Sequence, residues 1–254
     1  MKLHFEEYGQ ENNQYLIILH GLFGSADNWT SLGKQFARSY HVFLIDQRNH
    51  GRSPHHDQWN YEVMSDDLNS FLKEKGITSP YIIGHSMGGK TAMKFACSFP
   101  NNLQKLVVVD IAPKYYPVNH RSIIDGLQAV ANKSISKRKE ADEILATYIP
   151  ELPVRQFLLK NLIRVKDSMT WRMNLDVIDK LIENVGEELS DNESFAKETL
   201  FIRGINSNYI LDSDSEKIKF HFHKSQLVSI ENAGHWVHAE QPKEFIQSVL
   251  DFLA

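Results

Sequence analysis

The sequence is poor in cysteine, in long apolar runs and in excess positive charge. Cys97 is the single cysteine among 254 residues, so neither an intrachain disulfide nor a cysteine metal cluster can form. No segment approaches the roughly 18 consecutive apolar residues of a membrane-spanning helix, and the first residues lack the apolar stretch of a signal peptide. We therefore expect a chain without a membrane span that resides in the cytoplasm.

Charge and histidine spacing exclude two further classes. The chain has 28 basic and 32 acidic residues, giving a net charge of −4, whereas nucleic-acid binders usually carry a basic excess on one face. Its 12 histidines form no H-E-x-x-H or comparable metal-ligand pattern. We expect no nucleic-acid partner, no metal and no cofactor, and the sequence gives no indication of the oligomeric state.

Short β-branched apolar runs recur along the chain, each ending at a polar or glycine-rich turn. Such runs are typical of strands buried on both faces of a parallel sheet. Helical patterns lie between them, for example at 61–76 and 242–254. The alternation predicts an α/β fold, a mostly parallel twisted sheet flanked by helices. The expected strands are 15–21, 41–47, 80–86, 105–111, 199–205 and 226–235.

The alternation breaks between Pro113 and about Lys197. This segment has no convincing strand run and is rich in Lys, Glu, Leu and Ile at helical spacing. We expect a helical cap over one edge of the sheet, inserted between the strand that ends near Asp110 and the strand near Leu200. The expected domains are a core of residues 1–112 and 198–254 and a cap of residues 113–197.

The segment "IIGHSMGGKT" (82–91) matches two motifs at once. Its ending, with Lys90, fits the phosphate-binding pattern G-x-x-x-x-G-K-[ST]. Its centre fits G-x-S-x-G between a strand and a helix, which places Ser86 on a strained turn as a nucleophile. A hydrolase also needs a late histidine and an early loop of backbone donors; His235 in "ENAGHWVHAEQP" and the loop "HGLFGS" (20–25) supply both. We favour Ser86 as nucleophile and His235 as general base.

The segments "LHGLFGS", "DQRNHGRS", "GHSMGG", "VVDIAP" and "GHWVHAEQP" resemble, in this order, the signature segments of the α/β-hydrolase superfamily. The chain is similar in particular to small bacterial esterases of the YbfF type, which have relatives in mitochondria. This resemblance covers nearly the whole chain, including "WRMN" at 171–174. It implies an α/β-hydrolase fold and a serine hydrolase of carboxylic esters, with acyl-CoA thioesters as a further substrate class.

The resemblance also implies the oxyanion donors and the acid behind His235. The donors are the backbone N–H groups of Met87 and Leu22, with Phe23 as the alternative to Leu22. Family members commonly place an aspartate after the strand that reads "LFIRG" here, but this chain has Ser207 at that position.

A second position used in the superfamily holds Asp110, which we take as the acid. Ser207 is the alternative, or an additional partner of His235. Asp212 and Asp214 lie just beyond and are further candidates.

The remaining site residues are less sharply indicated. Candidates for lining a substrate pocket are Phe23, Trp171, Met173 and Trp236. Histidines elsewhere in the motifs are expected to be structural: His20, His50, His85 and His238. Carbon–carbon bond hydrolases and perhydrolases use the same three residue types, and a ligand receptor with little turnover can share the fold, so these functions remain alternatives.

Overall fold

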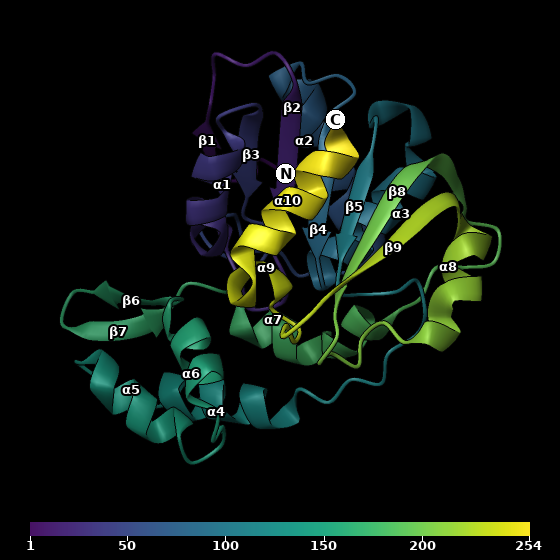
Figure 1. Ribbon diagram of the computed structural model, residues 1–254. Helices are drawn as coiled ribbons and strands as arrows, with labels where there is room; N and C mark the ends of the chain where they lie inside the picture. The colour runs from purple at the N-terminus through teal and green to yellow at the C-terminus, as the bar shows by residue number, and fades with distance from the viewer.

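A seven-stranded sheet forms the centre of the computed structural model, which describes residues 1–254 (Figure 1). The strand order is β1-β3-β2-β4-β5-β8-β9, and every neighbouring pair except the antiparallel β1 and β3 is parallel. The strands are β1 (Phe5–Tyr8), β2 (Tyr15–Leu19), β3 (His41–Ile45), β4 (Tyr81–His85), β5 (Leu106–Val109), β8 (Phe195–Gly204) and β9 (Phe222–Ile230). The expected α/β class with a mostly parallel sheet is confirmed.

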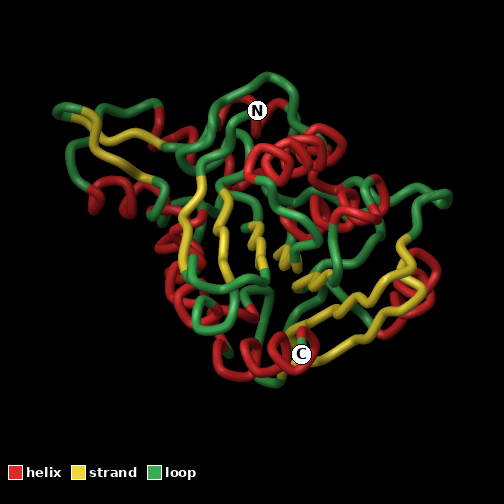
Figure 2. The backbone as a smooth tube through the Cα atoms, turned by 90° about the horizontal axis from the view of Figure 1, so that it is seen from above, coloured by secondary structure: helices red, strands yellow, loops and turns green.

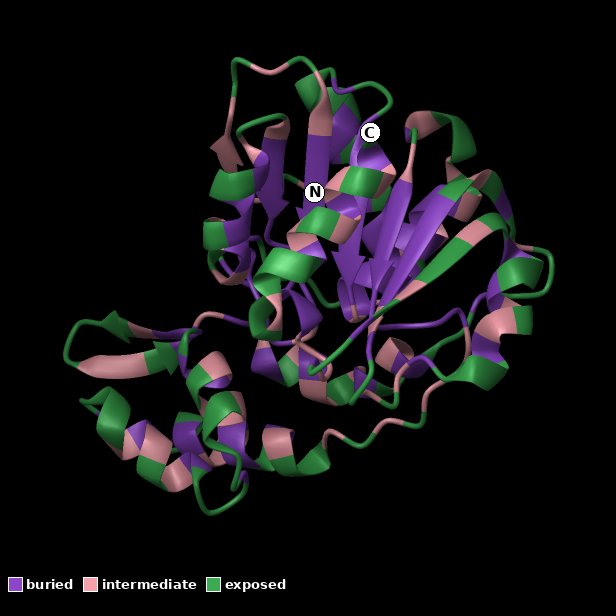
Figure 3. Ribbon diagram, in the orientation of Figure 1, coloured by how far each residue is buried: buried purple, intermediate pink, exposed green.

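Helices cover both faces of this sheet, which explains why its central strands read as continuous apolar runs. Figure 2 shows helices on either side of the strands, and Figure 3 shows that the central strands are buried while the outer helix faces are exposed. One apolar core includes side chains of α2 (Tyr61–Lys75), α3 (Met87–Ser98) and α8 (Ser215–His221). The core on the other face includes side chains of α1 (Thr30–Phe36), α9 (Val237–Glu240) and α10 (Pro242–Leu253).

The cap segment, residues 110–194 between β5 and β8, differs from the expectation in three ways. It holds a two-stranded antiparallel hairpin in addition to helices. It contacts loops after β2 and β3, through Asn161 to Phe23 and Asn174 to Asn49, and thus lies across the carboxyl ends of the strands and not over an edge. Strand β8 begins at Phe195, so 195–197 belong to the sheet. The segment contains α4 (Arg121–Ala131), α5 (Arg138–Leu145), α6 (Leu152–Leu159), β6 (Leu162–Val165), β7 (Ser168–Trp171), α7 (Leu175–Lys180) and the 3₁₀ turn η3 (Ile182–Gly186).

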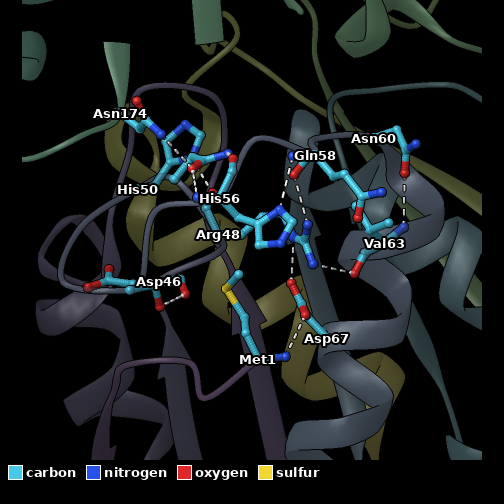
Figure 4. Close-up of polar contacts among 12 residues, drawn as sticks. Met1, Asp46, Arg48, His50, His56, Gln58, Asn60, Val63, Asp67 and Asn174 are labelled. Carbon is cyan, nitrogen blue, oxygen red and sulfur yellow. Dashed lines mark hydrogen bonds and ion pairs between the residues drawn. The ribbon is translucent and has the colours of Figure 1, made fainter. Parts of the chain in front are cut away.

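The loop after β3 is braced by two of the charged residues in "DQRNHGRS", Asp46 and Arg48. Asp46 accepts hydrogen bonds from the backbone N–H groups of Ala26 (2.6 Å) and Arg52 (2.8 Å). Buried Arg48 donates to Asp67 (2.6 Å) and to the Gln58 carbonyl (2.8 Å), which joins the loop to α2 (Figure 4). The loop therefore gives the cap segment a fixed surface to pack against.

None of the helices is long and apolar enough to span a membrane.

Candidate active site

Ser86 lies on a sharp turn between β4 and α3. Its φ of 52° and ψ of −118° are strained for a residue with a side chain. Only small residues fit around this turn: a Cβ on Gly84 would lie 2.2 Å from the Gly88 carbonyl oxygen, and one on Gly88 would lie 2.4 Å from the Leu19 carbonyl oxygen. The glycines of the motif therefore let strand and helix approach closely enough to hold the serine out.

The phosphate-binding interpretation of the same segment does not fit the position of Lys90. This side chain is buried, and its ammonium group donates to the carbonyl oxygens of Lys114 (2.5 Å) and Glu187 (2.6 Å). Burial lowers the pKa of Lys90 to about 7. Its role in the structure is to fasten the two ends of the cap segment to α3.

His235 is held by a buried carboxylate. Its Nδ1 lies 2.8 Å from Oδ2 of Asp110, which is fully buried after the end of β5. An ionised carboxylate can only accept, so Nδ1 carries the proton and Nε2 is left with a free lone pair. The backbone N–H of Gly204 donates to the other oxygen of Asp110 at 3.2 Å. Asp110 thus fixes both the orientation and the tautomer of the imidazole.

The other candidates for the acid form no hydrogen bond with His235. The Ser207 hydroxyl donates to Oδ2 of Asp110 and forms no hydrogen bond with His235, so it is a partner of the carboxylate rather than of the histidine. Asp212 forms an ion pair with Arg203, and Asp214 forms one with Lys114.

Of the two expected oxyanion donors, Met87 follows Ser86 in the chain, and Leu22 lines the same two cavities as Ser86. Met87 is the first residue of α3, where backbone N–H groups have no acceptor within the helix. Leu22 lies in the loop after β2, and its neighbour Phe23 has a positive φ of 57°. The cap residue Asn161 donates to the Phe23 carbonyl oxygen at 2.6 Å and fixes this loop.

Two cavities open beside Ser86, with volumes of about 250 and 310 Å³. Phe23 and Trp236, two of the predicted pocket residues, line the first cavity. Trp171 and Met173, the other two predicted pocket residues, line neither cavity. Both are buried in the apolar core of the cap segment, where the Trp171 indole donates to the Leu127 carbonyl oxygen at 2.9 Å.

Two residues beside Ser86 and His235 carried no signal in the sequence. The Tyr209 ring stacks on the His235 imidazole with a centroid separation of 3.9 Å and an interplanar angle of 18°. His120, in the cap segment, lines both cavities together with Tyr209. Neither belongs to a recognisable motif, because tertiary packing alone brings them to the site.

The histidines expected to be structural are buried around the site. His85 donates from Nε2 to the His235 carbonyl oxygen (2.8 Å), and His238 stacks on Trp29 at 4.0 Å. Burial lowers the pKa of His20 to about 4 and those of His50 and His238 to about 3. These three imidazoles are therefore neutral in the folded protein at pH 7.

Acid is expected to destabilise the fold through these histidines. Because the pKa values of these histidines are lowered in the folded protein, the unfolded chain binds more protons than the folded protein at acidic pH. Their contribution to the free energy of unfolding is therefore complete above pH of about 6.5 and is lost as the pH falls toward about 3 to 4. Each of the three histidines can lower the free energy of unfolding by up to about 1.4 kcal/mol for each pH unit of acidification in this range. His238→Phe, which keeps an aromatic ring beside Trp29, should reduce the fall of Tm between pH 6.5 and 5. An unchanged slope would contradict this assignment.

Comparisons with known proteins show the family of this chain. A family model described as the alpha/beta hydrolase fold matches residues 14–140. The mouse sn-1-specific diacylglycerol lipase ABHD11 is 39% identical over 247 residues, covering 94% of this chain and 80% of the mouse protein. The esterase YbfF of Escherichia coli is 35% identical, covering 96% of this chain and 94% of that protein.

A solved structure shows that the similarity extends to the three-dimensional fold. A marine microorganism esterase superimposes with a TM-score of 0.93 at 43% identity, covering 99% of each chain. These similar proteins are named as esterases and lipases, which supports a hydrolase. The matched segment contains Ser86 and Asp110, and the likeness of fold extends over the whole chain, His235 included. The chain therefore belongs to the α/β-hydrolase family and resembles esterases of the YbfF type.

Proposed function

We propose that this protein is a serine esterase that cleaves small carboxylic esters through an acyl-enzyme. Ser86 is the nucleophile, His235 the general base and Asp110 the acid that orients it. The observation that carries the proposal is the 2.8 Å contact of Asp110 with Nδ1 of His235, with Ser86 and His235 lining the same cavity.

The proposed reaction uses Nε2 of His235 as the base, because Nδ1 donates to Asp110. Nε2 of His235 takes the Ser86 proton while Oγ attacks the acyl carbon, and the Asp110 carboxylate stabilises the resulting imidazolium. The backbone N–H groups of Leu22 and Met87 would hold the oxyanion, and each well-placed donor is worth about 10²–10³ in rate. His235 then protonates the leaving alcohol. In the second half of the reaction, His235 takes a proton from a water molecule, which attacks the acyl-enzyme, and returns that proton to the Ser86 oxygen as the carboxylic acid leaves.

Thioesters present the same type of acyl carbon, so acyl-CoA thioesters form a second substrate class within this proposal. Carbon–carbon bond hydrolysis and perhydrolysis need the same nucleophile but other substrates. A ligand receptor would bind without turnover. A panel of esters, acyl-CoA thioesters and β-diketones, measured with one enzyme preparation, ranks these activities directly.

Labelling by a fluorophosphonate provides the decisive test. We expect the wild-type protein to hydrolyse p-nitrophenyl acetate and butyrate, and to lose this activity as one equivalent of the probe attaches. Peptide mass spectrometry should locate the adduct on Ser86, because attack on phosphorus requires the same activated hydroxyl. Absence of both turnover and labelling in folded protein would overturn the proposal, and an adduct at another serine would reassign the nucleophile.

A further inference from the structure

An aromatic ring lies against one face of the His235 imidazole. Tyr209, in the loop after β8, is nearly parallel to it, with ring centroids 3.9 Å apart and an interplanar angle of 18°. The negative face of an aromatic ring attracts a cation that lies over it within about 6 Å of the ring centre. In the proposed reaction, His235 becomes positively charged each time it takes the proton of Ser86 or of water. The Tyr209 ring is therefore placed where that charge develops.

Another stack of a histidine on an aromatic ring shows what stacking alone does. His238 lies on Trp29 with centroids 4.0 Å apart and an angle of 10°. Nδ1 of His238 has no hydrogen-bond partner, and burial lowers the pKa of this residue to about 3, so it stays neutral. His235 differs because the Asp110 carboxylate accepts from its Nδ1 and stabilises an imidazolium. Of these two stacks, the one at His235 thus joins an aromatic face to an imidazole that can take up a proton.

The Tyr209 ring is held in place by its own backbone and by a second ring. Its backbone N–H donates to the Ser207 hydroxyl oxygen at 3.2 Å, and its carbonyl oxygen accepts from the Tyr116 hydroxyl at 2.5 Å. The Tyr116 ring, in the cap segment, stacks on the Tyr209 ring with centroids 5.5 Å apart. Because the Ser207 hydroxyl also donates to Asp110, one hydroxyl links the acid to the residue that carries the ring. Acid, ring and imidazole are therefore positioned together.

The charge that faces His235 comes from Asp110, with which it forms an ion pair when protonated. Burial lowers the pKa values of the three imidazoles around it, which stay neutral: His85, His120 and His238. Burial, and the Asp110 carboxylate after it, raise the pKa of Tyr209, which stays a neutral phenol. The hydrogen bonds of Tyr209 come from its backbone and not from its hydroxyl. What this side chain offers His235 is the face of its ring.

We propose that Tyr209 is a positioning residue of the esterase reaction, whose ring face holds the His235 imidazole and stabilises the imidazolium during proton transfer. This inference rests on the proposed serine esterase function and adds to it a residue beyond the nucleophile, base and acid. An imidazolium forms when Ser86 attacks the ester and again when water attacks the acyl-enzyme. The Tyr209 ring therefore acts in both halves of the reaction.

The face of the ring can be altered while its shape is kept. Tyr209→Phe removes the hydroxyl and keeps the aromatic face. Pentafluorophenylalanine at the same position keeps a ring but withdraws the electron density of its face, and Tyr209→Leu removes the ring. The measurement is kcat and kcat/KM for p-nitrophenyl acetate across pH 5–9, wherever Tm shows folded protein. Titration with a fluorophosphonate counts the active sites in each preparation.

The aromatic face, and not the hydroxyl, is expected to set the rate. Tyr209→Phe should keep wild-type kcat within about twofold, whereas the fluorinated ring and Tyr209→Leu should each lower it by about three- to thirtyfold. Both of these should also move the acid limb of the kcat/KM profile to lower pH by about 0.5–1 unit, because protonated His235 loses a stabilising contact. A ring that merely lines the cavities would change KM and leave this limb in place.

Two results would overturn the inference. One is a loss of kcat in Tyr209→Phe as large as that in Tyr209→Leu, which would assign the effect to the hydroxyl. The other is an acid limb that stays in place with both the fluorinated ring and Tyr209→Leu, which would make Tyr209 a wall of the cavities alone. Absence of both turnover and labelling in the folded wild-type protein would instead overturn the esterase function, and this inference with it.

Discussion

Replacing Ser86 by alanine is expected to lower kcat for p-nitrophenyl butyrate by about 10⁶-fold, because no other group in the site supplies the attacking oxygen. Turnover that remains would come from binding and the oxyanion donors, which alone give about 10³–10⁴ over water. KM should change little, since the hydroxyl of Ser86 contributes mainly to the transition state.

The measurement needs proof that the variant is folded and free of wild-type contamination. Ser86→Ala should retain the wild-type Tm within a few degrees, because alanine fits the turn that Gly84 and Gly88 leave open. It should also take up no fluorophosphonate. A variant that keeps more than about 1% of wild-type kcat would show that Ser86 is not the nucleophile.

The central strands and the motif residues could be predicted from the sequence because each carries a local signal. Strands buried on both faces appear as apolar runs, and a nucleophile turn requires glycine at fixed positions. Strand β1 (Phe5–Tyr8) escaped prediction because it is a half-buried antiparallel edge strand that reads "FEEY". The hairpin of β6 and β7 escaped for a similar reason, since "LIRV" and "SMTW" are largely unburied.

The walls of the site could be predicted only in part. Trp171 is a large aromatic residue of the type that often lines pockets. Whether it faces a cavity beside Ser86 depends on the packing of the cap segment, which buries it in an apolar core. His120 and Tyr209 border Ser86 only through the tertiary positions of loops far from it in the chain. Contacts of this kind leave no periodicity or spacing in the sequence.

Asp110→Asn is expected to lower kcat by about 10⁴-fold with little effect on KM. The amide keeps the shape of the side chain but removes the charge that stabilises the His235 imidazolium. It also offers an N–H where Nδ1 of His235 donates, which favours the wrong tautomer. The measurement is kcat for p-nitrophenyl butyrate across pH 6–9, with the folded state checked by Tm.

Ser207→Ala is the matched comparison, because Ser207 touches the same oxygen of Asp110. Its loss removes one hydrogen bond to a carboxylate that keeps His235 and the Gly204 N–H, so kcat should fall by no more than about tenfold. A loss of several orders of magnitude in Ser207→Ala together with a small loss in Asp110→Asn would contradict the assignment of the acid.

The topology is consistent with the proposed acid after β5, although the resemblance to the family implies an acid after β8. These strands are parallel neighbours, with Val109 opposite Ile202, and the Asp110 N–H donates to the Ile202 carbonyl oxygen at 2.8 Å. Their carboxyl ends therefore reach the same place behind His235, and the Ser207 hydroxyl lies against the carboxylate that Asp110 supplies. On this geometry, Ser207→Asp in the Asp110→Asn background should restore at least about tenfold of the lost kcat, and no recovery would show that only the β5 position can orient His235.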